Sequence, residues 1–154
     1  NDSGRGLVIL GDGKGNFESL PGHLSGVLVY GEQRGAAFAD YNMDARIDLL
    51  VTQNGAKTKL YQNTNSKPGL RVRLRGPKNN PWAFGSKIRI QYNDGTMGPV
   101  REIQSGSGYW SQNSPIQVMG LKKEAKKVYI QWPDGSKTTE IVQGEKLIAT
   151  YRSP

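Results

Sequence analysis

The stretch 70-LRVRLR-75 alternates apolar and basic residues without interruption, and it decides the fold class of this sequence. Successive side chains of a strand point to opposite faces, so the two leucines and the valine line one face and the three arginines line the other. The pattern recurs at 87-KIRIQY-92, which runs into the tight-turn signal Asn93-Asp94-Gly95. Both segments predict strands with one buried face.

More strands are expected on either side of the turn Pro133-Asp134-Gly135, over residues 128–132 and 137–142, and a final strand over 146–151. Helical spacing is nearly absent, and its best candidate, Leu121–Ala125, is about one turn long. The 20 glycines and 8 prolines fall mostly between the apolar runs. The sequence therefore predicts an all-β, antiparallel protein in which one face of each sheet is buried.

Charge divides the 154 residues into two parts. Residues 1–66 carry six basic and seven acidic side chains, whereas residues 67–154 carry fifteen basic and six acidic ones, giving −1 and +9. We expect two units, 1–66 and 67–154, with the seam at Asn65–Gly69. The absence of cysteine excludes disulfides and thiolate chemistry. No apolar run approaches the roughly 20 residues of a membrane span, and no signal peptide is visible.

The first part has its own pattern. An apolar run at residues 7–10 is followed by a glycine-rich turn at 11–16, after which Phe17 is expected to return to the core. Residues 47–51 and 59–61 enclose a second such turn about forty residues later. Two copies suggest a repeat array of which more lies upstream. The first residue is not methionine, as in a processed protein or an excised piece.

The second copy contains 35-GAAFADYNMDARIDLLVTQN-54, in which oxygen-bearing side chains recur at short intervals. A loop of this spacing wraps a cation with positions 1, 3, 5 and 9 and with the carbonyl at position 7. The candidate ligands are Asp40, Asn42, Asp44, Asp48 and the backbone of Arg46. An all-oxygen set suits Ca²⁺. The alternative is a polar turn whose side chains cap backbone amides.

Electrostatics favours the cation, because three carboxylates within nine residues repel one another unless positive charge lies between them. Arg46 supplies part of that charge in the alternative reading. A helix-loop-helix calcium hand is excluded, since it requires glycine and glutamate where this chain has Ala45 and Val51.

"GAAFADYNMDARIDLLVTQNGAKTKLYQN", residues 35–63, resembles an FG-GAP (VCBS-type) repeat, the blade unit of integrin-like β-propellers. That resemblance implies Ca²⁺ in a D-x-[DN]-x-D-G-x-x-D loop, with Ala45 in place of the usual glycine. From Gly69 onward the chain resembles the ASPIC/UnbV domain through "GLRVRLRG", "FGSKIRIQYNDG", "VREIQSGSGYWSQ", "VMGL" and "WPDGSKTTEIV". That domain often follows such repeats in secreted proteins, and the resemblance implies no catalytic set. The two resemblances together imply partial propeller-type blades followed by an antiparallel, β-sandwich-like domain.

Two surfaces of the basic part are candidate ligand sites. Arg71, Arg73 and Arg75 would form a cationic stripe with Lys87 and Arg89 if strands 70–76 and 86–92 pair, or else a solvated face. Tyr109 and Trp110 follow the bend Gly106–Gly108, either as a ledge for a sugar or with Tyr109 planted in the core by a glycine bulge. Nucleic acid is not expected, because exposed stacking residues are not interleaved with the basic ones.

Catalysis is not expected either. His23, the only histidine, lies in a predicted surface loop with no partner, and nothing selects a carboxylate pair from residues such as Glu102 and Asp134. We therefore expect a non-catalytic, calcium-binding module, extracellular or periplasmic, that forms the C-terminal part of a propeller protein and binds a protein or glycan at a cell surface. The alternatives are a carbohydrate- or polyanion-binding module, or an accessory domain of a larger secreted enzyme.

Overall fold

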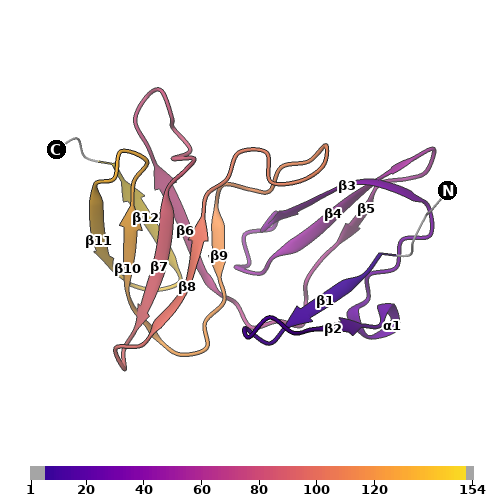
Figure 1. The fold of residues 1–154 in the computed structure, drawn as a ribbon, viewed down its shortest axis with the longest axis horizontal. Coiled ribbons are helices and arrows are strands. Elements are labelled where there is room, and N and C mark those ends of the chain that lie inside the picture. The colour runs from indigo at the N-terminus through magenta and orange to yellow at the C-terminus, as the bar shows by residue number, and fades with distance from the viewer. Residues whose placement is uncertain (1–5, 152–154) are drawn as a thin grey trace.

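The computed structural model describes residues 6–151, in which strands form four sheets and a single helical turn is present (Figure 1). The N-terminal part comprises β1 (Val8–Gly11), β2 (Phe17–Leu20), α1 (Gly22–Ser25), β3 (Glu32–Ala39), β4 (Asp48–Asn54) and β5 (Lys59–Tyr61). The C-terminal part comprises β6 (Leu70–Arg75), β7 (Lys87–Tyr92), β8 (Met97–Glu102), β9 (Gln117–Met119), β10 (Ala125–Gln131), β11 (Lys137–Ile141) and β12 (Lys146–Thr150). The all-β prediction is confirmed.

The C-terminal part is a sandwich of a four-stranded sheet, ordered β11-β10-β7-β8, and a three-stranded sheet, ordered β12-β6-β9. Its core takes alternate residues from both sheets, as the sequence pattern predicts. Trp132 lies in this core, and its ring meets that of Tyr151 edge-on at 5.4 Å between centroids. The fully buried members include Leu70, Val72, Ile88, Ile90, Val128 and Ile130.

One pairing differs from the expected antiparallel arrangement, and the pairing on which the arginine stripe depended is absent. The first and last strands of the sandwich, β6 and β12, run parallel, with Lys146 opposite Arg71 and Thr150 opposite Arg75. β6 and β7 do not pair, because residues 76–86 carry the chain across the core to the opposite sheet, burying Ala83 completely on the way. Two strands that each have one apolar face can cover one another across a core as well as pair edge to edge.

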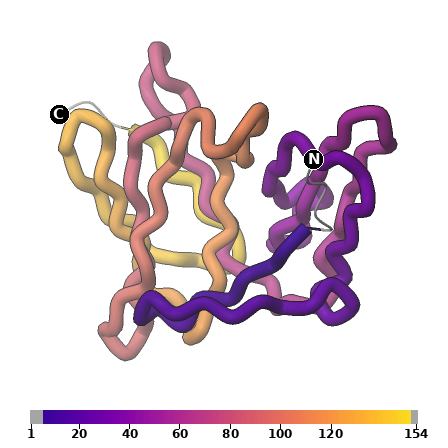
Figure 2. Tube along the Cα trace, turned by 45° about the vertical axis from the view of Figure 1, so that its right-hand side comes forward, coloured from indigo at the N-terminus to yellow at the C-terminus, as the bar shows by residue number. Residues whose placement is uncertain are grey.

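The N-terminal part consists of the β1–β2 hairpin and the sheet β3-β4-β5, which lie beside the sandwich (Figures 1 and 2). Apolar side chains of the hairpin are exposed: Ile9 by 52%, Leu10 by 52% and Phe17 by 76%. The expected return of Phe17 to a core is therefore wrong. Nothing in residues 6–151 covers this hairpin as the opposite sheet covers β7 and β10, and the main buried cluster is drawn from residues 70–149.

Of the predicted local elements, the turn at Asn93–Gly95 is present and the helical turn near Leu121 is not. The turn at Asn93–Gly95 is confirmed, since Gly95 has φ +84° and its amide donates to the Tyr92 carbonyl at 2.9 Å. Residues 121–124 are not helical, and the one helical turn is Gly22–Ser25, closed by Gly26 at φ +73°. Within the part of the chain that the structure describes, no helix has the length and apolar character to cross a membrane.

Candidate functional site

The loop between β3 and β4 holds every residue of the expected calcium site. Its backbone is tightly coiled, with Met43 at φ 61° and Ala45 at φ 62°. Both values lie in the left-handed region that favours glycine. Ala45 thus adopts the sharp turn for which calcium loops use glycine at their sixth position.

Backbone amides of the loop point at its first carboxylate. Asp40 Oδ1 accepts the Asp44 amide at 2.9 Å, and Asp40 Oδ2 accepts the Ala45 amide at 3.2 Å. Asn42 Oδ1 accepts the same Asp44 amide at 3.2 Å, and Asp44 Oδ1 accepts the Arg46 amide at 2.9 Å. Alternate side chains therefore cap backbone amides of the loop, as the polar-turn alternative describes, and calcium binding at this loop stays a prediction.

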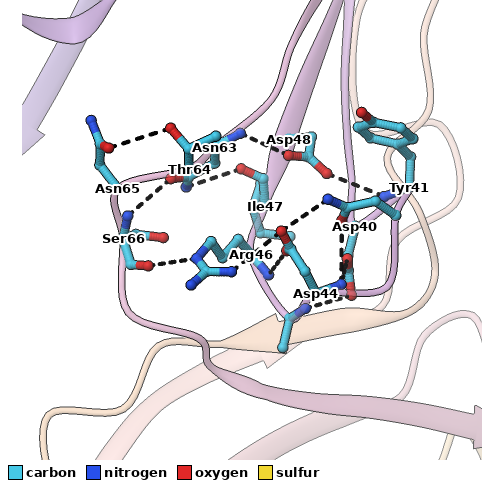
Figure 3. Close-up of polar contacts among 12 residues, drawn as sticks. Asp40, Tyr41, Asp44, Arg46, Ile47, Asp48, Asn63, Thr64, Asn65 and Ser66 are labelled. Carbon is cyan, nitrogen blue, oxygen red and sulfur yellow. Dashed lines mark hydrogen bonds and ion pairs between the residues drawn. The ribbon is translucent and has the colours of Figure 1, made fainter.

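The third acidic residue, Asp48, begins β4 and ties three segments together (Figure 3). Its Oδ2 accepts the Tyr41 amide at 3.2 Å, and its Oδ1 accepts the Asn63 amide at 2.8 Å. Asn63 in turn donates from its side chain to the Ile47 carbonyl at 3.2 Å. Asp48 is 2% exposed, and these amide donors compensate for its burial.

Two arginines bring positive charge to the loop. Arg46 lies against Asp44 at 3.3 Å and also donates from Nε to the Ser66 carbonyl at 2.7 Å. Hydrogen bonds from the Asn42 side chain, and then from the Arg46 amide and charge, lower the pKa of Asp44. Arg71 of β6 reaches the loop from the sandwich, its Nε 3.0 Å from Asp40 Oδ2.

Sequence reasoning named Arg46 as the neighbouring cation and missed Arg71, which contacts Asp40 from 31 residues away. The Asp40 side chain is only 1% exposed and that of Arg71 17%, so this pair is largely withdrawn from water. The alternation of β6 indicated that Arg71 points away from the sandwich core. It carried no sign that the N-terminal unit occupies that side.

The donors of the loop fit Ca²⁺ in their chemistry, because each oxygen has two lone pairs and the amide and guanidinium contacts leave some of them available. Within residues 6–151, however, no group of three or more carboxylate or imidazole side chains gathers as a metal cluster. The negative charge of the loop is balanced in part by Arg46, which pairs with Asp44, and by Arg71, which pairs with Asp40.

The loop also joins the two halves of the chain. The Gly69 amide, just before β6, donates to the Ala45 carbonyl at 2.8 Å. A second junction lies at the edge strand β3, where the Phe38 amide donates to Asn113 Oδ1 at 2.9 Å and the Ser114 amide donates to the Phe38 carbonyl at 2.8 Å. The segment around Asn113 therefore covers part of an edge that would otherwise be open to pairing.

The basic residues of the expected arginine stripe make different contacts and lie on two sheets. Arg71 pairs with Asp40, and Arg73 lies over the Trp82 ring at 5.6 Å from its centroid. Arg75 is exposed. Lys87 and Arg89 belong to the other sheet, so the five basic residues do not form one surface.

Tyr109 and Trp110 lie on the surface, exposed by 67% and 83%. The alternative that planted Tyr109 in the core is wrong. Their rings stack at 5.7 Å between centroids and 19° between planes, and Trp110 has φ +49°. A bulky residue in the left-handed region costs about 1–3 kcal/mol and often marks a functional position. An isolated bridge between Gly108 and Ser111 closes the bend beneath them.

The residues considered for catalysis are not brought together. His23 is exposed on α1 rather than in a loop. Asp134 accepts hydrogen bonds from Ser136 and from the Tyr151 hydroxyl, and these bonds lower its pKa. Glu102 ends β8, in the four-stranded sheet.

Comparison with known proteins supports part of the sequence reading. A family model described as ASPIC and UnbV matches residues 76–149. The resemblance of residues 35–63 to an FG-GAP repeat stays a prediction. Cartilage acidic protein 1 of Xenopus tropicalis is 28% identical over 121 residues, which cover 75% of this chain and 18% of that protein.

Two further relatives carry the same name. The Mus musculus protein is 27% identical over 123 residues, covering 76% of this chain and 19% of its own length. The Homo sapiens protein is 28% identical over 122 residues, covering 75% and 18%. The chain spans under a fifth of the length of these relatives. Their common ancestry with this chain is supported, and what the whole proteins do is not thereby carried over.

Proposed function

We propose that this chain is a non-catalytic extracellular module of a larger propeller protein, in which the loop at residues 40–48 binds Ca²⁺ and fixes the N-terminal sheet to the sandwich. The relatives' name refers to cartilage, which supports an extracellular location. The module would present its surfaces to a protein or glycan partner. Its role in adhesion follows from the resemblance to integrin-like blades alone.

The observation that carries the proposal is the direction in which the oxygen-bearing side chains of the loop point. Asp40, Asn42 and Asp44 all turn toward the loop's own backbone, around a path with two left-handed residues. Such side chains also cap a polar turn, and their recurrence at positions 1, 3 and 5 of a calcium-loop spacing is what supports a cation site here.

Calcium would be held by Asp40, Asn42, Asp44, Asp48 and the Arg46 carbonyl, and its task would be structural. The ion would add positive charge among carboxylates that Arg46 and Arg71 already balance in part. Because Asp40 and Ala45 both bond to the sandwich side, ordering the loop orders the junction.

The test is a thermal melt with millimolar Ca²⁺ and with EDTA, followed by calcium titration calorimetry. We expect Ca²⁺ to raise the midpoint, since a ligand of the folded state stabilises it by mass action. Asp44→Ala should abolish the shift. Asp12→Ala is the matched control, because Asp12 is also a turn carboxylate that accepts nearby backbone amides, those of Lys14 and Asn16, and it lies outside the loop. Superimposed melts of the wild type would refute the proposal.

A variant of Arg71 distinguishes the two cations that could neutralise the loop, Ca²⁺ and the Arg71 guanidinium. If Ca²⁺ binds beside Asp40, then Arg71→Met removes a competing charge and should tighten calcium binding, by about tenfold. If the guanidinium is the only cation that the loop takes, the variant loses stability and calcium does not restore it.

A second candidate function is carbohydrate binding at Tyr109 and Trp110. The exposed stacked rings and the strained backbone of Trp110 favour it. Titration with neutral oligosaccharides should change Trp fluorescence in the wild type and not in Trp110→Ala, with Trp82→Ala as a control that removes a half-exposed Trp elsewhere. The absence of any saccharide-dependent change would remove this candidate.

A further inference from the structure

Three neighbouring strands of the four-stranded sheet, β11, β10 and β7, lie side by side (Figure 1), and their register places basic residues on its outer face. In an antiparallel pair, residues directly opposite each other share a face. The register gives three cross-strand rows, which are Lys137–Gln131–Lys87–Glu102, Thr139–Tyr129–Arg89–Val100 and Ile141–Lys127–Gln91–Met97. We call the residues that β11, β10 and β7 contribute to these rows the cationic face.

The cationic face brings four positive charges close together, those of Lys87, Arg89, Lys127 and Lys137. Strands lie about 4.8 Å apart and alternate residues about 6.8 Å apart, so all four Cα atoms fall within a patch of roughly 10 by 14 Å. Glu102 is the one carboxylate on the three rows, and it lies at the β8 edge.

The basic side chains of the cationic face form none of the ion pairs found among residues 6–151. The ion pairs among residues 6–151 involve Arg34, Arg46, Arg71 and Lys123, and none of them lies on the cationic face. On the outer face of the three-stranded sheet, by contrast, Arg71 forms an ion pair with Asp40, and Arg73 makes a cation–π contact with Trp82. The two faces of the sandwich therefore differ in available charge, although both are rich in arginine and lysine.

The face is also fixed in shape. Between its outward residues, Ile88, Ile90, Val128 and Ile130 are fully buried in the core. Arg89 donates from Nε to the Gly98 carbonyl at 2.8 Å, which holds its guanidinium along β8. The Tyr129 hydroxyl bonds to Gln91 Oε1 at 3.1 Å. Preorganised charges lose less entropy when a ligand binds.

We infer that the cationic face is a docking surface for a linear acidic polysaccharide. Four cations on a flat sheet match the regularly spaced sulfates or carboxylates of such a chain. Gln91, Gln131 and Thr139 lie among the cations and offer hydrogen bonds to sugar hydroxyls. Nucleic acid is disfavoured, because Tyr129 is the only aromatic residue on the rows and single strands need successive stacking platforms.

This inference deepens the proposed function by naming a partner class, and it is physically separate from the calcium loop. Chelation should leave polysaccharide binding unchanged if the sandwich stays folded. A protein that binds the glycan in EDTA but shows no calcium shift would retain this inference and lose the calcium proposal.

The experiment measures binding of a heparin octasaccharide by calorimetry at several salt concentrations. The wild type should bind, with a slope of log K against log salt of roughly −3 for four cations. Lys87→Gln/Lys127→Gln should weaken binding about tenfold or more and make the slope shallower by roughly 1.5. Glutamine avoids placing a second carboxylate opposite Glu102.

The matched control is Arg75→Gln/Lys146→Gln, which removes the same charge from exposed positions of the opposite sheet. It should bind like the wild type. Equal weakening by both double variants would overturn the inference, as would wild-type binding to single-stranded DNA or phosphatidylserine vesicles that matches or exceeds binding to heparin. Melting curves show whether each variant is folded, and Arg89→Gln/Lys137→Gln serves if the first variant is not.

Discussion

Arg71 and Asp40 form an ion pair of 3.0 Å between the first strand of the sandwich and the loop that ends β3, with the carboxylate 1% exposed. The pair links the part of the chain that has the main core to the part that does not. A buried carboxylate that loses its cation keeps its desolvation cost, so this contact is a sensitive point in the junction.

Arg71→Met should therefore destabilise the protein by about 3 kcal/mol, measured by urea unfolding without calcium. The control is Arg34→Met, whose pair with Glu32 is also 3.0 Å long but about half exposed. That pair should contribute no more than about 1 kcal/mol. Equal losses in the two variants would mean that Asp40 is better hydrated than its burial indicates.

Met43→Gly should stabilise the loop by about 0.5–1 kcal/mol, because Met43 has φ 61° while its side chain is 61% exposed and packs little. Met97→Gly gives the opposite sign, a loss of about 0.5–1 kcal/mol, since Met97 lies in the extended strand β8. Thermal melts measure both. A loss in Met43→Gly would show that the left-handed turn is not strained.

Trp110→Phe should lower the accessibility of the remaining tryptophans to acrylamide and shift the emission to shorter wavelength. Trp110 is 83% exposed and Trp82 43%, whereas Trp132 is 2% exposed and donates to Thr138 Oγ1 at 3.0 Å. Trp132→Phe should shift emission the other way and also cost stability, by about 1–3 kcal/mol. If removing Trp110 leaves acrylamide quenching of tryptophan fluorescence unchanged, the surface of Tyr109 and Trp110 is covered in solution.

Asp94 gives a prediction for acid pH. The Lys123 ammonium beside it, together with hydrogen bonds from Thr96, lowers the pKa of Asp94 from 3.8 to about 2. A depressed carboxyl pKa adds stability that is complete above the unfolded value and is lost as the pH falls from about 4 to about 2. NMR titration of Lys123→Met should show the Asp94 pKa rising toward 3.8. An unchanged pKa would assign the shift to the Thr96 hydrogen bonds.

Asn113→Ala should loosen the cover of the β3 edge. The Phe38 amide would lose its acceptor at 2.9 Å, at a cost of about 1 kcal/mol, while the Ser114 bond to the Phe38 carbonyl would remain. Hydrogen exchange at Phe38 should speed up by roughly fivefold, with exchange at Ile88 in the core as the internal reference. Equal protection in both proteins would place the cover elsewhere.

The strands of the sandwich were predictable because they encode their own burial. The alternation in β6 and β7 reports one wet and one dry face, and the turn at Asn93–Gly95 states where the chain reverses. Pairing order was not predictable from the same signals. Alternation does not distinguish a neighbour in the sheet from a neighbour across the core, and so the parallel β6–β12 pair and the absence of a β6–β7 pair were missed.

The loop was foreseeable for a different reason. Asp40, Asn42 and Asp44 cap backbone amides two to four residues away, and such local contacts follow from the spacing of polar residues in the sequence. The partner of Asp40 is not local, since Arg71 reaches it from the other half of the chain. The sequence left both a surface and a core position open for Tyr109, which is exposed, because a glycine bend does not specify to which side it directs the next ring.

The parallel pairing of β6 with β12 has a mechanical consequence. Because the two strands run in the same direction, tension applied at Leu70 and Thr150 pulls them past one another along their length, and the hydrogen bonds between them resist together instead of opening in sequence. A sandwich fastened in this way should withstand stretching between those two points better than between the ends of the β10–β11 hairpin, a difference that single-molecule pulling would reveal.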